Sequence, residues 1–135
     1  MRPTWDEIWA NFAKNIASRS IDPKHKVGAI VVNSENTQVL SIGYNGDHKG
    51  GPNSRDSLEV GKSGFIHAEI NALIKCDYNN PANKKMYVTL SPCDVCAKAI
   101  INAGIEEVIY LERYEQSNGI DTVSYTHLRA HETTS

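Results

Sequence analysis

The sequence predicts one layered α/β domain, in the order helix, strand, strand, helix, strand, helix, strand. The chain has 135 residues, a length that forms one hydrophobic core and little more. Apolar residues recur at helical spacing in some segments and form short β-rich runs in others. One helical segment stands between two such runs, and a strand–helix–strand of this length is typical of a right-handed parallel crossover.

The expected elements follow in chain order. They are a helix from Thr4 to about residue 18, strands over 27–32 and 39–44, a loop over 45–64, a helix over 65–76, a strand over 86–90, a helix over 91–102 and a strand over 107–111.

Capping signals mark the ends of two of the helices. Thr4 and Glu7 form a capping box for the first helix. Ser91 suits the N-cap of the third helix, with Pro92 at its first position and Gly104 at its C-terminal cap. The second helix is predicted from its apolar spacing alone.

The strands are predicted from β-rich apolar runs. Residues 27–32 are apolar enough to be buried on both faces, and a turn over 33–36 makes 39–44 their antiparallel partner. Residues 86–90 and 107–111 flank the third helix, so we expect them to pair in parallel. The loop over 45–64 is rich in glycine and polar residues, and a loop of that length is usually functional.

Composition excludes several classes of protein. A net charge of −2 and a pI of about 6.2 argue against a chain that binds nucleic acid by bulk charge. We expect no membrane span and no secretory signal, because no apolar run approaches ~20 residues and no apolar stretch follows the N-terminus. An odd, small set of cysteines (Cys76, Cys93, Cys96) then indicates the cytoplasm rather than a disulfide scaffold.

Two short motifs carry the chemistry. His67 and Glu69 stand near the start of one predicted helix, and Cys93 and Cys96 share a face at the start of another. Two thiolates and one imidazole make a tetrahedral zinc site with one position open for a water, whose pKa zinc lowers. Glu69 is placed to take a proton from that water. A Cys-x-x-Cys alone fits a structural zinc site or a redox pair, but His-x-Glu with Pro-Cys-x-x-Cys is typical of zinc-dependent nucleobase deaminases.

The other candidate residues have ordinary interpretations. Cys76 is expected to be a core or helix-end residue. His25 and His48 stand among polar residues, where we expect them to be solvated or at most substrate or subunit contacts. The loop before His67 holds no cysteine, so a second, structural zinc is not expected there.

From about residue 5 to 121 the chain resembles the cytidine and deoxycytidylate deaminase superfamily, and most closely its deoxycytidylate (dCMP) deaminase branch. The matching pieces are Arg19-Ser20-x-Asp22-Pro23, Val27-Gly28-Ala29, Gly43-Tyr44-Asn45-Gly46, His67-Ala68-Glu69-x-Asn71-Ala72, Ser91-Pro92-Cys93-x-x-Cys96 and Ala103-Gly104-Ile105-x-x-Val108-Ile109-Tyr110.

The resemblance implies a three-layer α/β/α fold with a central mixed β-sheet, and hydrolysis of dCMP to dUMP and ammonia. It matches His67, Cys93 and Cys96 to the zinc ligands and Glu69 to the proton shuttle. It further implies a homo-oligomer, commonly a hexamer in this branch, and dCTP or dTTP as effectors.

Three substrate contacts follow from the same resemblance. The backbone N–H of Ala68 matches a donor to the pyrimidine ring, Asn45 a contact to the sugar, and Tyr114 an aromatic residue beside the nucleotide. Asn45 as a plain turn residue and Tyr114 as a surface aromatic stay open as alternatives. For the 5′-phosphate the sequence leaves six candidates open: Arg19, Ser20, Lys24, Lys26, Lys49 and Arg55.

Two questions of organisation and activity also stay open. Residues 1–123 are expected to form the deaminase domain, whereas 124–135 (SYTHLRAHETTS) do not continue the family pattern, either as non-native sequence or as a divergent tail. The alternatives in function are a deaminase of cytidine, guanine or tRNA adenosine, and a non-catalytic zinc or nucleotide-binding regulator. The acidity of the chain counts against tRNA, and Glu69 counts against a purely structural zinc site.

Overall fold

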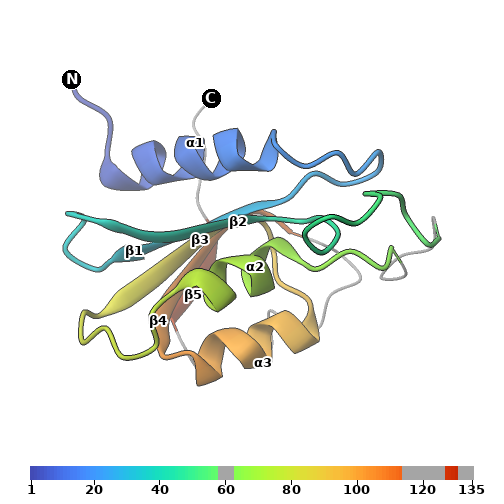
Figure 1. The fold of residues 1–135 in the computed structure, drawn as a ribbon. Coiled ribbons are helices and arrows are strands. Elements are labelled where there is room, and N and C mark those ends of the chain that lie inside the picture. Colours follow the sequence, from blue (N-terminus) through green and yellow to red (C-terminus); the bar gives the residue numbers. More distant parts are fainter. Residues whose placement is uncertain (58–62, 114–126, 131–135) are drawn as a thin grey trace.

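The structure is a computed structural model that describes residues 1–57, 63–113 and 127–130. These residues contain three helices and five strands (Figure 1). In chain order they are α1 (Trp5–Ala17), β1 (Gly28–Asn33), β2 (Val39–Tyr44), α2 (Ala68–Lys75), β3 (Lys84–Leu90), α3 (Asp94–Asn102), β4 (Ile105–Glu112) and β5 (His127–Ala130).

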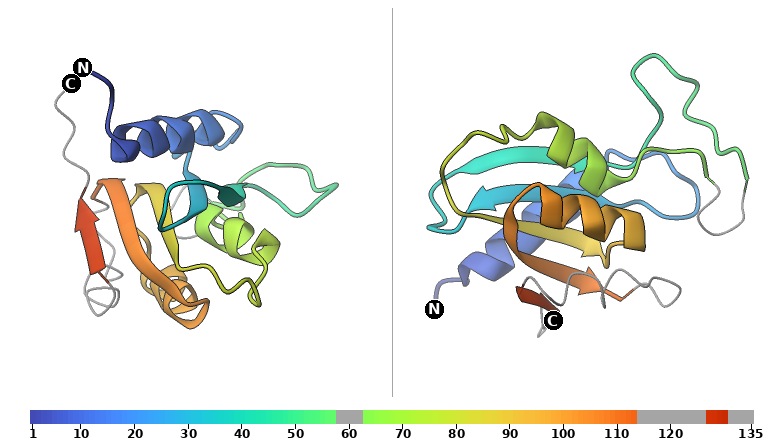
Figure 2. Two further views of the ribbon diagram at one scale, coloured as in Figure 1. Left: turned by 90° about the vertical axis from the view of Figure 1, so that its left-hand side faces the viewer. Right: turned by 90° about the horizontal axis from the view of Figure 1, so that it is seen from below.

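The strands form one mixed sheet in the order β2-β1-β3-β4-β5. β1 pairs antiparallel with both β2 and β3, whereas β3 with β4 and β4 with β5 pair in parallel. α1 covers one face, and α2 and α3 cover the other (Figures 1 and 2). The predicted three-layer α/β/α arrangement with a central mixed sheet is therefore confirmed.

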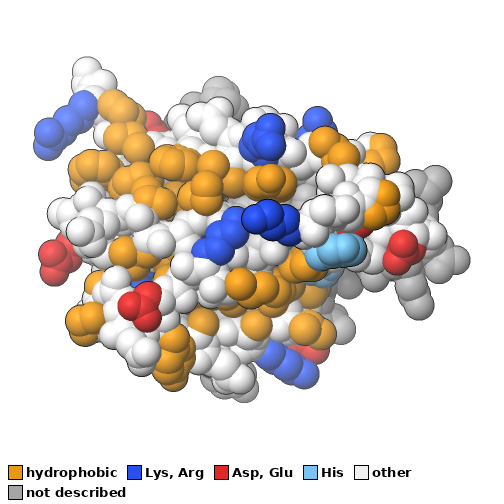
Figure 3. Space-filling view, in the orientation of Figure 1, with side chains coloured by type: hydrophobic (Ala, Val, Ile, Leu, Met, Phe, Trp, Pro, Cys, Tyr) orange, Lys and Arg blue, Asp and Glu red, His pale blue; other side chains and the backbone are white. Residues whose placement is uncertain are grey.

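β1 is the centre of the core because every one of its residues is buried. Ile30 and Val32 belong to a cluster with Trp9 of α1, and Ala29 and Val31 belong to the cluster on the opposite face. Alternate residues of a strand point to opposite faces, so an unbroken apolar run is what a strand between two helical layers requires. Figure 3 shows a further band of hydrophobic side chains between α1 and the edge of the sheet at β2.

Two helices begin later than the sequence predicts. α3 begins at Asp94 because Cys93, rather than Ser91, is its N-cap, and the Cys93 sulfur accepts the backbone N–H of Cys96 at 3.4 Å. α2 begins at Ala68, since Ile66 instead forms an isolated bridge with Gly46. The prediction of Ser91 as the cap was wrong, and the correction puts both His67 and Cys93 at helix N-caps.

The sequence pattern did not predict β5. Its four residues fall inside 124–135, yet they pair in parallel with β4, from Glu107 opposite His127 to Tyr110 opposite Ala130. The division of the chain at residue 123 stays a prediction. Among the helices of the described residues, none is long and apolar enough to cross a bilayer.

Candidate active site

The predicted metal ligands lie together. The Nδ1 atom of His67 is 3.2 Å from the sulfur of Cys96 and 3.5 Å from that of Cys93, and the three ligand atoms all lie within 4.8 Å of one another. Within residues 1–57, 63–113 and 127–130, this is the one group of His, Cys and acidic side chains arranged in this way. Two sulfurs and an imidazole nitrogen are a donor set that zinc favours, with a fourth tetrahedral position to spare.

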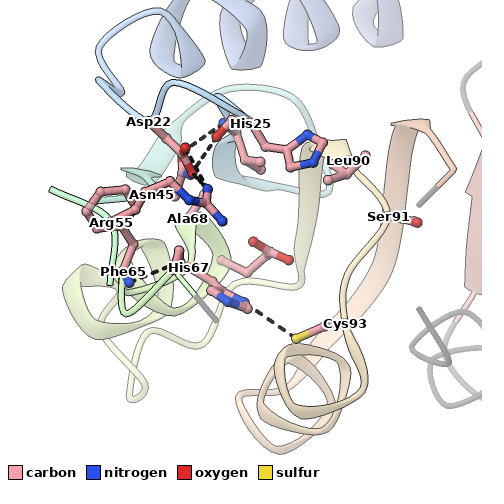
Figure 4. Close-up of a pocket in the computed structure, with 13 residues that line it drawn as sticks. Asp22, His25, Asn45, Arg55, Phe65, His67, Ala68, Leu90, Ser91 and Cys93 are labelled. Atoms are coloured by element: carbon pink, nitrogen blue, oxygen red, sulfur yellow. Dashed lines mark hydrogen bonds and ion pairs between the residues drawn. The ribbon is translucent and has the colours of Figure 1, made fainter. Parts of the chain in front are cut away.

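Local structure explains why these three atoms meet. His67 and Cys93 are the N-caps of α2 and α3 (Figure 4), two helices on the same face of the sheet. Cys96 lies in the first turn of α3. A helix N-terminus favours negative charge, so the end of α3 supports a thiolate. The site is therefore built from two helix starts.

Hydrogen bonds within the group favour the thiolate form of one cysteine. Hydrogen bonding to Cys96, and then to His67, lowers the pKa of the Cys93 thiol to about 4, against an opposing effect of burial. The same Cys93 hydrogen bond, followed by burial, raises the pKa of Cys96, and the Cys93 contact raises that of His67. A bound dication would add its own charge and favour both thiolates.

Glu69 lies beside this group and is buried. It is 4% exposed, and burial raises the pKa of its carboxyl group to about 7. Its side chain is hydrogen-bonded to the thiol of Cys96. The position combines closeness to the ligands with exclusion of bulk solvent, which suits a group that exchanges protons with a bound substrate.

A cavity of about 120 Å³ opens onto these residues. His67, Glu69 and Cys93 line one side of it, and Ala68 lies between the first two. Ala68 is the first residue of α2, where backbone N–H groups have no partner within the helix. The predicted ring donor is therefore in the cavity wall, whereas Tyr114 lies outside the described residues.

Asn45 lines the cavity, but its side chain is committed to the protein. Its Oδ1 accepts the backbone N–H of Val27 at 2.9 Å, and its Nδ2 donates to Asp22 at 3.1 Å and to the carbonyl oxygen of His25 at 2.7 Å. Both amide hydrogens are thus engaged. These bonds hold the segment before β1 against the cavity, a positioning role; direct contact of Asn45 with a sugar stays a prediction.

A buried ion pair completes the opposite wall. Nη1 of Arg55 lies 2.7 Å from both carboxylate oxygens of Asp22, and the two side chains are 7% and 3% exposed. Burial by itself raises the pKa of Asp22, but hydrogen bonds from the Lys24 backbone and from Arg55 outweigh it and lower the pKa. Arg55 belongs to the 45–64 loop, so the pair attaches that loop to the cavity wall.

This ion pair was not predicted from the sequence. In the sequence, Asp22 stood out only as part of a motif after the first helix, and Arg55 only as one of six candidates for binding the 5′-phosphate. The two are 33 positions apart, and no local pattern connects residues at that separation. His25 also lines the cavity, and its contact with a substrate or a subunit stays a prediction. Cys76 is confirmed as a helix-end residue that packs against the core.

Two glycines on paired strands let helices approach opposite faces of the sheet. A Cβ atom on Gly43 would overlap the backbone of α2 at Ala68 and Ala72, and one on Gly28 would overlap the backbone of α1. Because His67 is the N-cap of α2, Gly43 sets the distance of a metal ligand from the sheet.

We expect Gly43→Ala to weaken zinc binding by about 10- to 100-fold, the loss typical of disturbing the support of a metal ligand. Gly28→Ala is the matched control: overpacking costs each variant about 1–3 kcal/mol of stability, but α1 carries no ligand. Competition with a chromophoric chelator measures the zinc affinity, and thermal denaturation measures the stability. Equal losses of zinc affinity in the two variants would contradict the assignment.

Comparison with known proteins places this site in a family context. Residues 3–112 match the protein family described as the cytidine and deoxycytidylate deaminase zinc-binding region. The chain is 38% identical over 123 residues to a Homo sapiens protein named deoxycytidylate deaminase, covering 84% of this chain and 68% of the human one. It is 36% identical over 124 residues to deoxycytidylate deaminase of Mycobacterium phage D29, covering 81% and 95%.

Similarity also extends to a solved structure. The dCMP deaminase of cyanophage S-TIM5, crystallised in complex with dCMP and dUMP, matches with a TM-score of 0.81 and 31% identity. The match covers 98% of this chain and 99% of the phage chain. The family match over residues 3–112 contains all three candidate ligands.

Proposed function

The chain belongs to the cytidine and deoxycytidylate deaminase family, and from this premise we propose that it is a zinc-dependent hydrolase that converts dCMP and water into dUMP and ammonia. The observation that carries the proposal is the convergence of His67, Cys93 and Cys96 beside the buried Glu69, at a cavity that His67, Glu69 and Cys93 line. Relatives named deoxycytidylate deaminase support dCMP as the substrate.

In this proposal His67, Cys93 and Cys96 would hold the ion, and bound zinc would supply a water molecule of lowered pKa beside the substrate. The carboxylate of Glu69 takes a proton from the attacking water and delivers it to N3 of the ring as the water oxygen bonds to C4. Glu69 then moves the remaining hydroxyl proton to the amino nitrogen. The C4–N bond breaks, ammonia leaves, and C4 keeps the oxygen as a carbonyl. One carboxylate serves first as base and then as acid.

The surrounding residues orient the ring for this step. The backbone N–H of Ala68 donates to the pyrimidine, and Asn45 keeps the segment before β1 in place through its three hydrogen bonds. The Asp22–Arg55 pair attaches the segment around Arg55 to the wall of the cavity. Such fixed contacts lower the cost of orienting the substrate.

Ammonia release from dCMP, CMP, cytidine, deoxycytidine, guanine and tRNA tests the proposal. We expect the zinc-loaded protein to release one ammonia for each dUMP formed, with dCMP the best substrate. Preference for another member of the panel would replace dCMP as the substrate. Binding of dCMP by the folded, zinc-loaded protein without any ammonia release would favour the non-catalytic regulator.

We further propose that the protein is a cytoplasmic homo-oligomer, such as a hexamer, with dCTP and dTTP as effectors. Three free cysteines support a reducing compartment. Exposed apolar side chains on or beside α2 and α3 support self-association: Ile74, Tyr78 and Val95. The Gly43-Tyr44-Asn45-Gly46 motif supports effector control by family resemblance. Light scattering tests the oligomeric state. The substrate panel, repeated with dCTP and with dTTP, tests the effectors.

A further inference from the structure

A second groove, of about 410 Å³, adjoins the cavity. The two share a wall formed by His25, Val27 and Leu90. The groove lies where β3 and β4 end, at Leu90 and Glu112. Ligands of α/β sheets commonly bind outside the carboxyl ends of parallel strands. A molecule with its ring in the cavity could therefore extend past His25 and Leu90 into the groove.

The groove is basic although the protein as a whole is acidic. Lys14 of α1 and Lys24 and Lys26 of the segment before β1 line it, against one carboxylate, Glu112. The chain carries a net charge of −2, so this is a local concentration of positive charge. A phosphate monoester carries about −1.5 to −2 charges at neutral pH, and a charged groove attracts such a group.

The structure narrows the choice among the six phosphate candidates. Arg19 lies over the ring of Tyr44, 6.0 Å from its centre, and the Ser20 hydroxyl donates to the Asn45 carbonyl oxygen at 2.9 Å. Lys49 lines neither the cavity nor the groove. These three candidates are therefore placed away from the groove or engaged elsewhere.

Arg55 lines the cavity itself, but its charge is balanced by the buried carboxylate of Asp22. Lys24 and Lys26 line the groove, and they flank His25, which lines both the groove and the cavity. Lys14 was not among the sequence candidates, because nothing in its helix indicated that it faces the segment before β1.

We propose that Lys24 and Lys26, with Lys14, are the specificity-determining residues that bind the 5′-phosphate and so select a nucleotide over a nucleoside. The inference rests on the proposed function, because the phosphate reaches the groove only when the pyrimidine occupies the cavity. Glu69 and the metal ligands lie on the other side of the shared wall, so the chemistry at the ring does not depend on these lysines.

The test compares a K24Q/K26Q variant with wild type on dCMP and on deoxycytidine. We expect kcat/KM for dCMP to fall by about 10- to 100-fold, the effect of losing charge-assisted contacts to a phosphate. The value for deoxycytidine should stay unchanged, and the dCMP value should become less sensitive to salt. The control variant K49Q/K75Q makes the same change in charge at two lysines that line neither opening.

An unchanged ratio of the two kcat/KM values in K24Q/K26Q would overturn the inference, as would an equal fall in the control. Binding of dUMP against deoxyuridine, measured by calorimetry, separates this result from a failure of the proposed function. Weaker binding of dUMP alone in K24Q/K26Q supports the phosphate role even if wild type turns over neither substrate. Equal affinities of wild type for dUMP and deoxyuridine would overturn it.

Discussion

Glu69→Gln is expected to lower kcat for dCMP by about 10²- to 10⁴-fold, the usual contribution of a positioned general acid–base group. The amide has the shape of the carboxyl group but cannot accept a proton from water. Zinc should stay bound, because the ligand atoms belong to His67, Cys93 and Cys96. Metal content, melting temperature and single-turnover rate, measured on one preparation, check all parts of this prediction.

The fold should survive this change. Glu69 is buried, and burial already works against its charged form, so a neutral group of equal size costs little stability. Glu35→Gln, in the exposed turn between β1 and β2, is the control for loss of a carboxylate and should keep full activity. A Glu69→Gln enzyme with nearly normal turnover would refute the assignment of the proton shuttle. Loss of zinc together with activity would instead make Glu69 a support of the metal site.

Local spacing explains why the metal site was predictable. His67 and Glu69 are two residues apart and Cys93 and Cys96 three apart, so each pair is held together by its own helix start. Only the meeting of the two helix starts depends on how the chain folds. The strand–helix–strand pattern around α3 indicated the part of the fold that contains Cys93 and Cys96. The burial of both faces of β1 was likewise predictable, because it follows from an unbroken run of apolar residues in the chain.

The parts that the sequence did not predict depend on distant contacts. The Asp22–Arg55 pair joins the segment after α1 to a loop beyond β2, and the basic groove joins Lys14 of α1 to Lys24. Neither has a local signal, because each depends on how loops pack after the sheet has formed. The start of α3 was misplaced for a related reason: the Cys93 sulfur caps the helix, and cysteine is not a usual N-cap residue.

Cys93→Ala is expected to remove zinc binding and stability together. Alanine removes a ligand atom, and it also removes the sulfur that accepts the Cys96 backbone N–H at the start of α3. Loss of an N-cap costs about 0.5–2 kcal/mol. Loss of the ion costs more, since zinc at a thousand times its dissociation constant stabilises the folded state by about 4 kcal/mol. Activity should disappear with the metal.

Thermal melts with and without zinc separate these two contributions. The melting temperature of wild type should rise with added zinc, whereas that of Cys93→Ala should not respond to it. Cys76→Ala is the control, because Cys76 lies at the far end of α2 and packs against the core; it should lose some stability but keep its response to zinc. With a chelator present, the stability of wild type should exceed that of Cys93→Ala only by the contribution of the N-cap hydrogen bond. A metal-free Cys93→Ala protein that melts like zinc-loaded wild type would mean that the ion does not stabilise the fold, and that α2 and α3 hold their places by packing alone.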